Sequence, residues 1–115
     1  YDSARSSGRI FQYDLTGGRY EEHDHAATGS GSLHATTVVM LGWRSDLDSD
    51  STVDLALRAL LEAADEDSAT GGVDLLRGIY PVVATIDASG FNRIEDDRLS
   101  ERYAQLLDEL REVRS

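Results

Sequence analysis

The chain has 115 residues, of which 40% are hydrophobic, so its size and composition favour one domain with a single core. The 22 acidic residues outnumber the 11 basic ones, and the net charge of −11 argues against nucleic-acid binding, because phosphate contacts require lysine and arginine. The absence of cysteine excludes disulfides and thiolate zinc sites, and no apolar run approaches the roughly 20 residues that cross a membrane, so we expect a soluble, cytoplasmic protein.

The first predicted element is a pair of strands. Residues 8–14 carry the aromatic and β-branched content of a strand, and residues 16–18 (Thr-Gly-Gly) follow as a turn. Residues 19–28 are the expected partner strand, with their acidic side chains facing water. We expect residues 1–7 to form a loop or a frayed entry.

Residues 33–43 are ambiguous between a strand and a helix. The run Thr36-Thr37-Val38-Val39 favours a strand on propensity. Eleven residues with little turn chemistry also suit a buried helix, so the residues alone leave both open, with a slight preference for the strand.

The clearest predicted element is a helix over residues 52–66. Ser51 and Asp54 form a plausible capping box at its start. Ala59 and Ala63 give the opposite side room for a second neighbour, so we expect a helix that lies between two layers. Its apolar side chains recur with helical spacing: Val53, Ala56, Leu57, Leu60, Leu61 and Ala64.

The last third of the chain predicts a hairpin and a helix. Residues 79–86 and 91–94 are the expected strands, joined by a turn over residues 87–90, and Pro81 should lie at an edge, a bulge or a strand start. A helix should begin near Asp97. Its apolar stripe is Leu99, Tyr103, Leu106, Leu107, Leu110 and Val113. Strands and helices in separate runs indicate an α+β layered fold.

Two short strings hold the candidate functional residues. Ser30 stands between two glycines, which leaves its hydroxyl free to point into a site, although such a loop is more often structural. Asp67 follows a helix end that already carries Asp65 and Glu66, where negative charge is unfavourable. A solvated acidic turn explains this pattern, and so does a carboxylate turned inward to orient a nucleophile, with Thr70 adding a hydroxyl.

Metal sites are weaker interpretations. His23 and His25 alternate on the second predicted strand and could hold a metal together with Glu21. A strand edge that faces water explains these residues better. The aspartates of residues 46–50 resemble the start of a calcium loop, yet its sixth and twelfth positions hold Ser51 and Leu57. We expect neither a metal nor a cofactor.

Together these strings resemble the second half of an actinobacterial 20S proteasome β subunit. The resemblance covers nearly the whole chain, and it implies a helix after the turn at residues 29–32. The stretches that carry it are Gly8-Arg9-Ile10-Phe11 with Tyr13-Asp14 and Gly17-Gly18, Ala27 to Leu33, and Ala63 to Gly72 followed by Asp74 and Arg77 to Pro81.

The resemblance implies part of a four-layer αββα N-terminal-nucleophile hydrolase sandwich with antiparallel sheets, with residues 1–115 as the C-terminal part of one domain. The family hydrolyses peptide bonds with an N-terminal threonine whose own amine takes the proton. Ser30, Asp67 and Thr70 match the family's supporting network, while the nucleophile, its lysine and the oxyanion-hole amide belong to the first half. Asp14 weakly matches a position that lines a neighbouring subunit's substrate channel.

The implied partners are proteasome α subunits and other β subunits in stacked seven-membered rings, together with an ATPase ring and the tagged or unfolded proteins that it delivers. The fragment alone should be inactive. The alternatives are a truncated or inactive β-like chain with a structural or assembly role, and an unrelated acidic α+β binding module. His34 stands where members of the family often have phenylalanine, and the uncharged residues 36–43 stand where they often carry lysines. The resemblance places the second stretch in a helix that contributes to contacts between β rings, so a changed contact between rings is conceivable.

Overall fold

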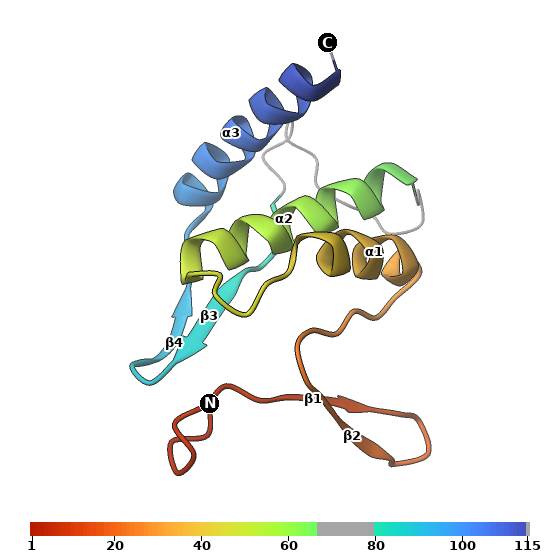
Figure 1. The fold of residues 1–115 in the computed structure, drawn as a ribbon, viewed down its shortest axis with the longest axis vertical. Helices are drawn as coiled ribbons and strands as arrows, with labels where there is room; N and C mark the ends of the chain where they lie inside the picture. The colour runs from red at the N-terminus through yellow and green to blue at the C-terminus, as the bar shows by residue number, and fades with distance from the viewer. Residues whose placement is uncertain (67–79, 115) are drawn as a thin grey trace.

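The computed structural model describes residues 1–66 and 80–114. These residues form helices and antiparallel hairpins in the predicted order, which confirms a mixed α+β structure (Figure 1). The elements are β1 (Ile10–Tyr13), β2 (Arg19–Glu22), α1 (Ser32–Gly42), α2 (Ser49–Glu66), β3 (Ala84–Asp87), β4 (Gly90–Arg93) and α3 (Asp96–Arg114). No helix within the described residues is long and apolar enough to cross a membrane.

The first hairpin pairs β1 with β2 in a register that places Ile10 opposite Glu22 and Tyr13 opposite Arg19. Gly17 has a φ of +91°, a conformation that glycine adopts without steric cost, so the predicted turn is confirmed. The predicted strand over residues 19–28 is too long, because β2 ends at Glu22. Residues 1–7 curl into a small turn closed by the bridge between Asp2 and Ser7.

Helix α2 lies between α1 and α3 (Figure 1). The helical alternative for residues 33–43 is confirmed, because α1 spans Ser32–Gly42 despite its β-branched residues. It is not the buried helix that its composition suggested. None of its side chains is fully buried, and Leu33 and Leu41 are 78% and 85% exposed.

The start of α2 differs from the predicted capping box. Asp48 precedes the helix, and its Oδ1 accepts a hydrogen bond from the backbone N–H of Ser51 at 2.7 Å. This bond favours the ionised carboxylate and lowers the pKa of Asp48. Ser51 is therefore the third residue of the helix and not its cap, because the aspartate three positions earlier satisfies a free N–H group of the first turn.

The core forms where α2 packs against α3. It consists of Val53, Leu57, Leu99, Tyr103 and Leu106, with Leu61, Tyr80, Val83 and Ile94 packed around it. The predicted α2 stripe is thus too wide, since Ala56 is exposed and Leu60 is 39% exposed, on a flank that the described elements leave open. Ala59 and Ala63 are buried outside this cluster, as expected for a helix with neighbours on two sides.

A charged contact ties the same two helices together. Arg102 of α3 donates from Nη1 to Asp54 Oδ1 at 2.5 Å and lies with Nη2 2.9 Å from Asp50 Oδ1. The arginine side chain is only 18% exposed, whereas Asp50 and Asp54 are 77% and 44% exposed. The hydrogen bond to Asp54 raises the pKa of Arg102, so the guanidinium stays charged in its half-buried position.

The second hairpin is shorter than predicted. β3 begins at Ala84, the preceding residues 80–83 are irregular, and Pro81 lies in this segment before the strand. Ile79, the predicted strand start, lies outside the described residues. The turn is confirmed: Asp87 Oδ1 accepts from the backbone N–H and the hydroxyl of Ser89 at 2.8 and 2.5 Å, and Gly90 has a φ of +106°.

Candidate functional site

Ser30 lies in the tight turn that leads into α1. Gly29 has a φ of +102°, and its carbonyl accepts a hydrogen bond from the N–H of Ser32 at 3.1 Å. Gly31 is buried and accepts from the N–H of Ala35, so the two glycines fix the turn while Ser30 stays exposed at its tip. The sequence correctly predicted a turn here, and the catalytic role of Ser30 stays a prediction.

Asp67 and Thr70 lie outside the described residues. The described part of α2 ends at Glu66, the residue directly before Asp67 in the sequence. Ser30 lies two residues before the start of α1, and α1 packs along α2. Whether the side chains of Ser30 and Asp67 meet stays a prediction.

Asp14 organises the turn of the first hairpin. Its Oδ1 accepts from the backbone N–H of Gly18 at 2.7 Å and from the N–H and hydroxyl of Thr16, and its Oδ2 accepts from the Tyr20 hydroxyl at 2.9 Å. The Gly18 bond, followed by those from Tyr20 and Thr16, lowers the pKa of Asp14. The structure thus gives Asp14 a role in holding the hairpin, and its suggested place in a substrate channel stays a prediction.

Gly18 leaves room for the same arrangement. A Cβ atom at this position would lie 2.5 Å from Asp14 Oδ2 and 2.7 Å from the Tyr20 hydroxyl oxygen. Both distances are too short for real Cβ contacts, so a side chain here would displace the hydrogen bond between the two residues. The Gly-Gly pair predicted a turn, but only the folded hairpin shows which glycine makes room for the carboxylate.

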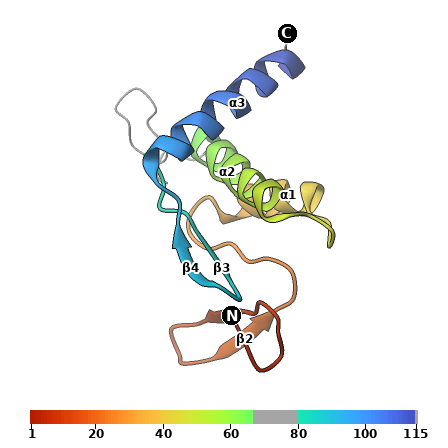
Figure 2. The ribbon, with the colours of Figure 1, turned by 90° about the vertical axis from the view of Figure 1, so that its left-hand side faces the viewer.

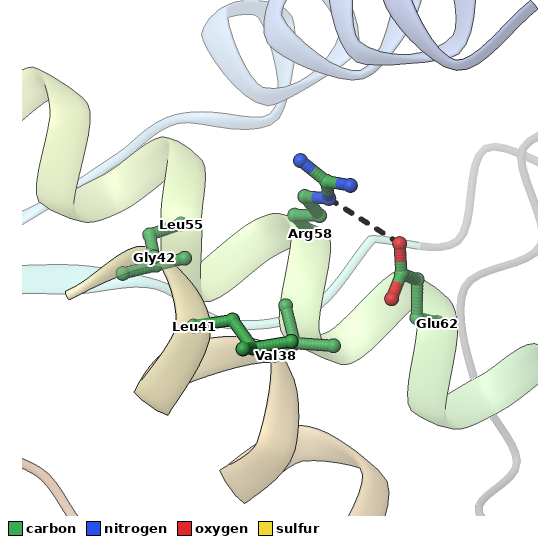
Figure 3. A pocket seen from close by; sticks show the side chains of 6 residues that line it. All are labelled: Val38, Leu41, Gly42, Leu55, Arg58 and Glu62. Carbon is green, nitrogen blue, oxygen red and sulfur yellow. Dashed lines mark hydrogen bonds and ion pairs between the residues drawn. The ribbon is translucent and has the colours of Figure 1, made fainter. Parts of the chain in front are cut away.

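A small groove separates α1 from α2 (Figure 3). It encloses about 150 Å³ between Val38, Leu41 and Gly42 of α1 and the facing part of α2. On the α2 side, Arg58 Nε lies 3.3 Å from Glu62 Oε1 at the edge of the groove. Gly42 allows the close approach, since a Cβ there would lie 2.6 Å from a methyl group of Leu55. The groove is mostly apolar, and no hydroxyl, imidazole or carboxylate pair suited to nucleophilic chemistry lines it.

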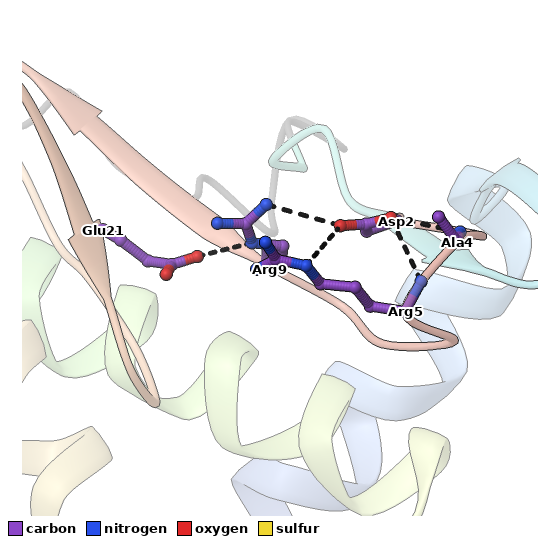
Figure 4. A network of polar contacts seen from close by, with 5 residues as sticks. All are labelled: Asp2, Ala4, Arg5, Arg9 and Glu21. Carbon is purple, nitrogen blue, oxygen red and sulfur yellow. Dashed lines mark hydrogen bonds and ion pairs between the residues drawn. The ribbon is translucent and has the colours of Figure 1, made fainter.

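The N-terminal turn carries a second polar network (Figure 4). Arg9 Nε donates to Glu21 Oε2 at 2.6 Å across the hairpin, while its Nη1 lies 3.3 Å from Asp2 Oδ2. The guanidinium of Arg9 also lies over the Phe11 ring, with 4.8 Å to its centroid. These contacts attach the turn to the β1–β2 hairpin, and they give Glu21 of β2 a structural role as the partner of Arg9.

The metal hypotheses receive no support from the geometry of the described residues, which contain no cluster of three or more potential ligands. Glu21 pairs with Arg9, and Asp48 and Asp50 serve α2 and Arg102. Sequence reasoning missed the helix-linking role of Arg102. Its only signal was a charged residue directly beside Tyr103 in the last helix, which does not reveal a partner about 50 positions away.

Comparison with known proteins identifies the family. The model described as "Proteasome subunit" matches residues 1–76. Proteins called "Proteasome subunit beta" from Acidimicrobium ferrooxidans, Acidothermus cellulolyticus and Streptomyces griseus subsp. griseus are 54%, 49% and 47% identical to this chain. The matches cover 97%, 92% and 94% of this chain but 41%, 37% and 38% of those relatives, so the chain spans about two fifths of their length. The chain belongs to the proteasome subunit family, and it is similar to β subunits from actinobacteria.

Proposed function

We propose that residues 1–115 form the C-terminal part of a β subunit of the 20S proteasome core. The observation that carries the proposal is 54% identity to a proteasome β subunit across 97% of this chain. In the complete subunit, an N-terminal threonine upstream of Tyr1 would hydrolyse peptide bonds, and this chain would supply residues that support it. The subunit would assemble with α and β partners in seven-membered rings in the cytoplasm and degrade tagged or unfolded proteins delivered by an ATPase.

The exposed apolar side chains of both hairpins support a larger fold. Phe91 and Ile86 of the second hairpin are 67% and 59% exposed, and Tyr13 and Tyr20 of the first are 68% and 56% exposed. Isolated two-stranded sheets are marginal in water and are stabilised by further strands or a packed layer. We therefore infer that both hairpins join larger sheets in the complete subunit, as the four-layer αββα sandwich requires.

The proposed mechanism gives this chain a supporting role. A threonine hydroxyl is a weak nucleophile and needs a base to take its proton, here its own amine. Ser30, Asp67 and Thr70 would hold that amine by hydrogen bonds in the orientation and protonation state in which it accepts the proton. The turn at residues 29–32 supports this role for Ser30, because it exposes the serine and is held by its glycines.

The test is peptide hydrolysis by the complete, assembled subunit. We expect Asp67→Asn to lower the turnover of a fluorogenic peptide about 100-fold or more, as for the loss of a group that orients an acid–base catalyst. Ser30→Ala should cost about tenfold, the value of one hydrogen bond of about 1.4 kcal/mol. Asp65→Asn is the matched control, since it removes the same charge two residues earlier.

Equal activity of the Asp67→Asn and Asp65→Asn variants would contradict the assigned network. A complete subunit that forms rings but never reacts with a threonine-directed covalent inhibitor would instead favour the assembly-only alternative. Labelling by the inhibitor is a separate measurement from turnover, so it distinguishes a missing nucleophile from a misplaced support residue.

A further inference from the structure

The packing of α1 on α2 depends on the shape of the side chains between them. Within the part of the chain that the structure describes, α1 packs mainly against α2, and no hydrogen bond or ion pair joins the two helices. Two helices in such a contact approach to about 8–10 Å between their axes, at a distance that the contacting side chains set. The residues of this contact therefore decide how close α1 lies to α2.

Gly42 lies at a close point of this contact. A Cβ atom at this position would lie 2.6 Å from Leu55 Cδ1 and 3.6 Å from both Cγ and Cδ2 of the same side chain. The φ of Gly42 is not positive, so its backbone conformation does not require glycine. What glycine supplies here is space for the neighbouring helix.

The two helices run in opposite directions. Gly42, at the end of α1, lies beside Leu55 in the first half of α2 (Figure 3). Val38, one turn earlier in α1, lines the groove together with Arg58 and Glu62, which come later in α2. The start of α1 therefore lies toward the C-terminal half of α2 (Figure 1).

The turn that carries Ser30 is attached to the start of α1. The N–H of Ala35, in the first turn of the helix, donates to the carbonyl of Gly31 at 3.1 Å. The 11 residues of α1 make a helix about 16 Å long. A helix moves as one body, so a displacement of α1 at Gly42 is carried to Ser30 at its other end.

We propose that Gly42 is a positioning residue for Ser30. The inference rests on the supporting role of Ser30 given under the proposed function. Glycine at position 42 lets α1 lie close to α2, and α1 in turn sets the place of the Ser30 turn. Groups that support catalysis act only within a narrow geometry, and a displacement of about 1 Å by a remote substitution can lower the rate about 100-fold.

The first experiment measures peptide turnover by the complete, assembled subunit with Gly42→Val. Leu55 can turn into the groove to avoid a single methyl group, but valine adds three carbons. Carbon atoms pack at about 3.5–4.0 Å, so α1 must move by about 1 Å at this end. We expect kcat to fall about three- to tenfold with KM unchanged, because the loss of the Ser30 hydroxyl, about tenfold, sets the upper bound.

Two further variants show whether space is the cause. Met40→Val places the same side chain at a position of α1 that is 65% exposed and outside the groove, and it should keep full turnover. Leu55→Ala removes as many carbons as Gly42→Val adds, so the Gly42→Val/Leu55→Ala variant should recover most of the turnover. Helix propensity would not explain a loss, since valine is a better helix former than glycine.

Equal turnover of the Gly42→Val and Met40→Val variants would overturn the proposal, and so would a loss that Leu55→Ala does not restore. If the valine variant does not assemble, Gly42→Ala takes its place, with a smaller expected loss and the same test of recovery.

A double-mutant cycle tests whether Gly42 acts through Ser30. In a Ser30→Ala background, Gly42→Val should cause little further loss, within about twofold, because the hydroxyl that it positions is gone. A further loss of about three- to tenfold would overturn the proposal, since Gly42 would then act by another route. Full turnover of the Ser30→Ala variant alone would reject the proposed function of Ser30 and this inference with it. A loss for Ser30→Ala without one for Gly42→Val would reject the inference alone.

The second experiment determines the structure of the assembled Gly42→Val variant by electron microscopy or crystallography, a readout that does not depend on activity. After superposition on α2, Ser30 should be displaced by about 1 Å, and it should return to its place in the Gly42→Val/Leu55→Ala variant. Met40→Val is the reference and should leave Ser30 where it is. An unmoved Ser30 beside a reoriented Leu55 would overturn the proposal, because α1 would then not transmit the change.

Discussion

The α2–α3 contact and the β1–β2 hairpin are held together by different forces. The helices bury Leu57 and Leu99 completely and add a half-buried arginine between two carboxylates. The hairpin buries no side chain fully and depends on the polar contacts of Asp14 and Arg9. In both views it lies at the end of the molecule opposite the C-terminus (Figures 1 and 2). The comparison teaches that burial supplies most of the stability, while exposed hydrogen bonds fix local shape.

The largest effect should come from truncating the helix core. Leu57→Ala removes a side chain with no exposed surface, and we expect a loss of about 2–5 kcal/mol in the free energy of unfolding of the complete subunit. Leu60→Ala is the matched control, because Leu60 lies one turn along the same helix and is 39% exposed. Denaturant unfolding measures both, and equal losses would contradict the assignment of the core to the α3 side of α2.

Removal of the arginine between the helices should have a smaller effect. Arg102→Ala leaves Asp50 and Asp54 without their cation, and we expect a loss of about 1–2 kcal/mol, limited because both carboxylates stay accessible to water. Arg102→Lys should restore part of this loss, since an ammonium group can reach one carboxylate but cannot form the fork. Denaturant unfolding at low and high salt measures the loss, and an Arg102→Ala variant as stable as the unmodified subunit would contradict it.

A substitution at Tyr103 should change stability in the opposite direction. Tyr103 is 1% exposed, and its hydroxyl has no hydrogen-bond partner among the described residues. Burial raises its pKa to about 12, so the hydroxyl stays neutral at physiological pH. Tyr103→Phe keeps the ring stacked on Tyr80 and removes the unsatisfied group, so we expect a gain of up to about 1 kcal/mol in denaturant unfolding. A clear loss would reveal a partner for the hydroxyl in the complete subunit.

The smallest effect should be confined to the hairpin and depend on pH. The folded hairpin lowers the pKa of Asp14 below its ordinary value of 3.8, chiefly through the Gly18 N–H. The ionised carboxylate therefore stabilises the hairpin above pH 3.8, and this contribution is lost as the pH falls through the folded-state pKa. We expect the protection of the Gly18 and Thr16 amides, measured as their exchange rates relative to the intrinsic rates at the same pH, to fall in this acidic range, with no change in the α2–α3 core.

Asp14→Asn is the control for the pH dependence. It should give faster exchange at neutral pH and little further change on acidification, because the amide cannot ionise. If the Asp14→Asn variant instead showed the same pH dependence of exchange as the unmodified subunit, another group would control the exchange, and Asp14 would not be the acceptor that holds the turn.

The sequence by itself predicted the family, the order of elements and the turns. Local chemistry suffices at Gly17 and Gly90, where positive φ favours glycine, and in the last helix, where Leu99 and Tyr103 recur with helical spacing. It could not decide residues 33–43, because their composition suits both a strand and a helix with a slight preference for the strand, and only the resemblance favoured the helix that α1 forms. The helix cap was misassigned because Ser51 and Asp48 are both good capping residues three positions apart.

Contacts between distant residues were decided by the tertiary structure. The selection of Leu57 for the core and the exposure of Leu60 depend on which flank of α2 meets α3, and a helical pattern does not contain that information. Arg102 finds Asp54 across 48 positions, and Gly42 lies against Leu55 because α1 and α2 pack together. Periodicity and turn chemistry are properties of neighbouring residues, so the sequence shows them directly. Burial and charge pairing depend on which elements pack together, and only the folded chain determines that.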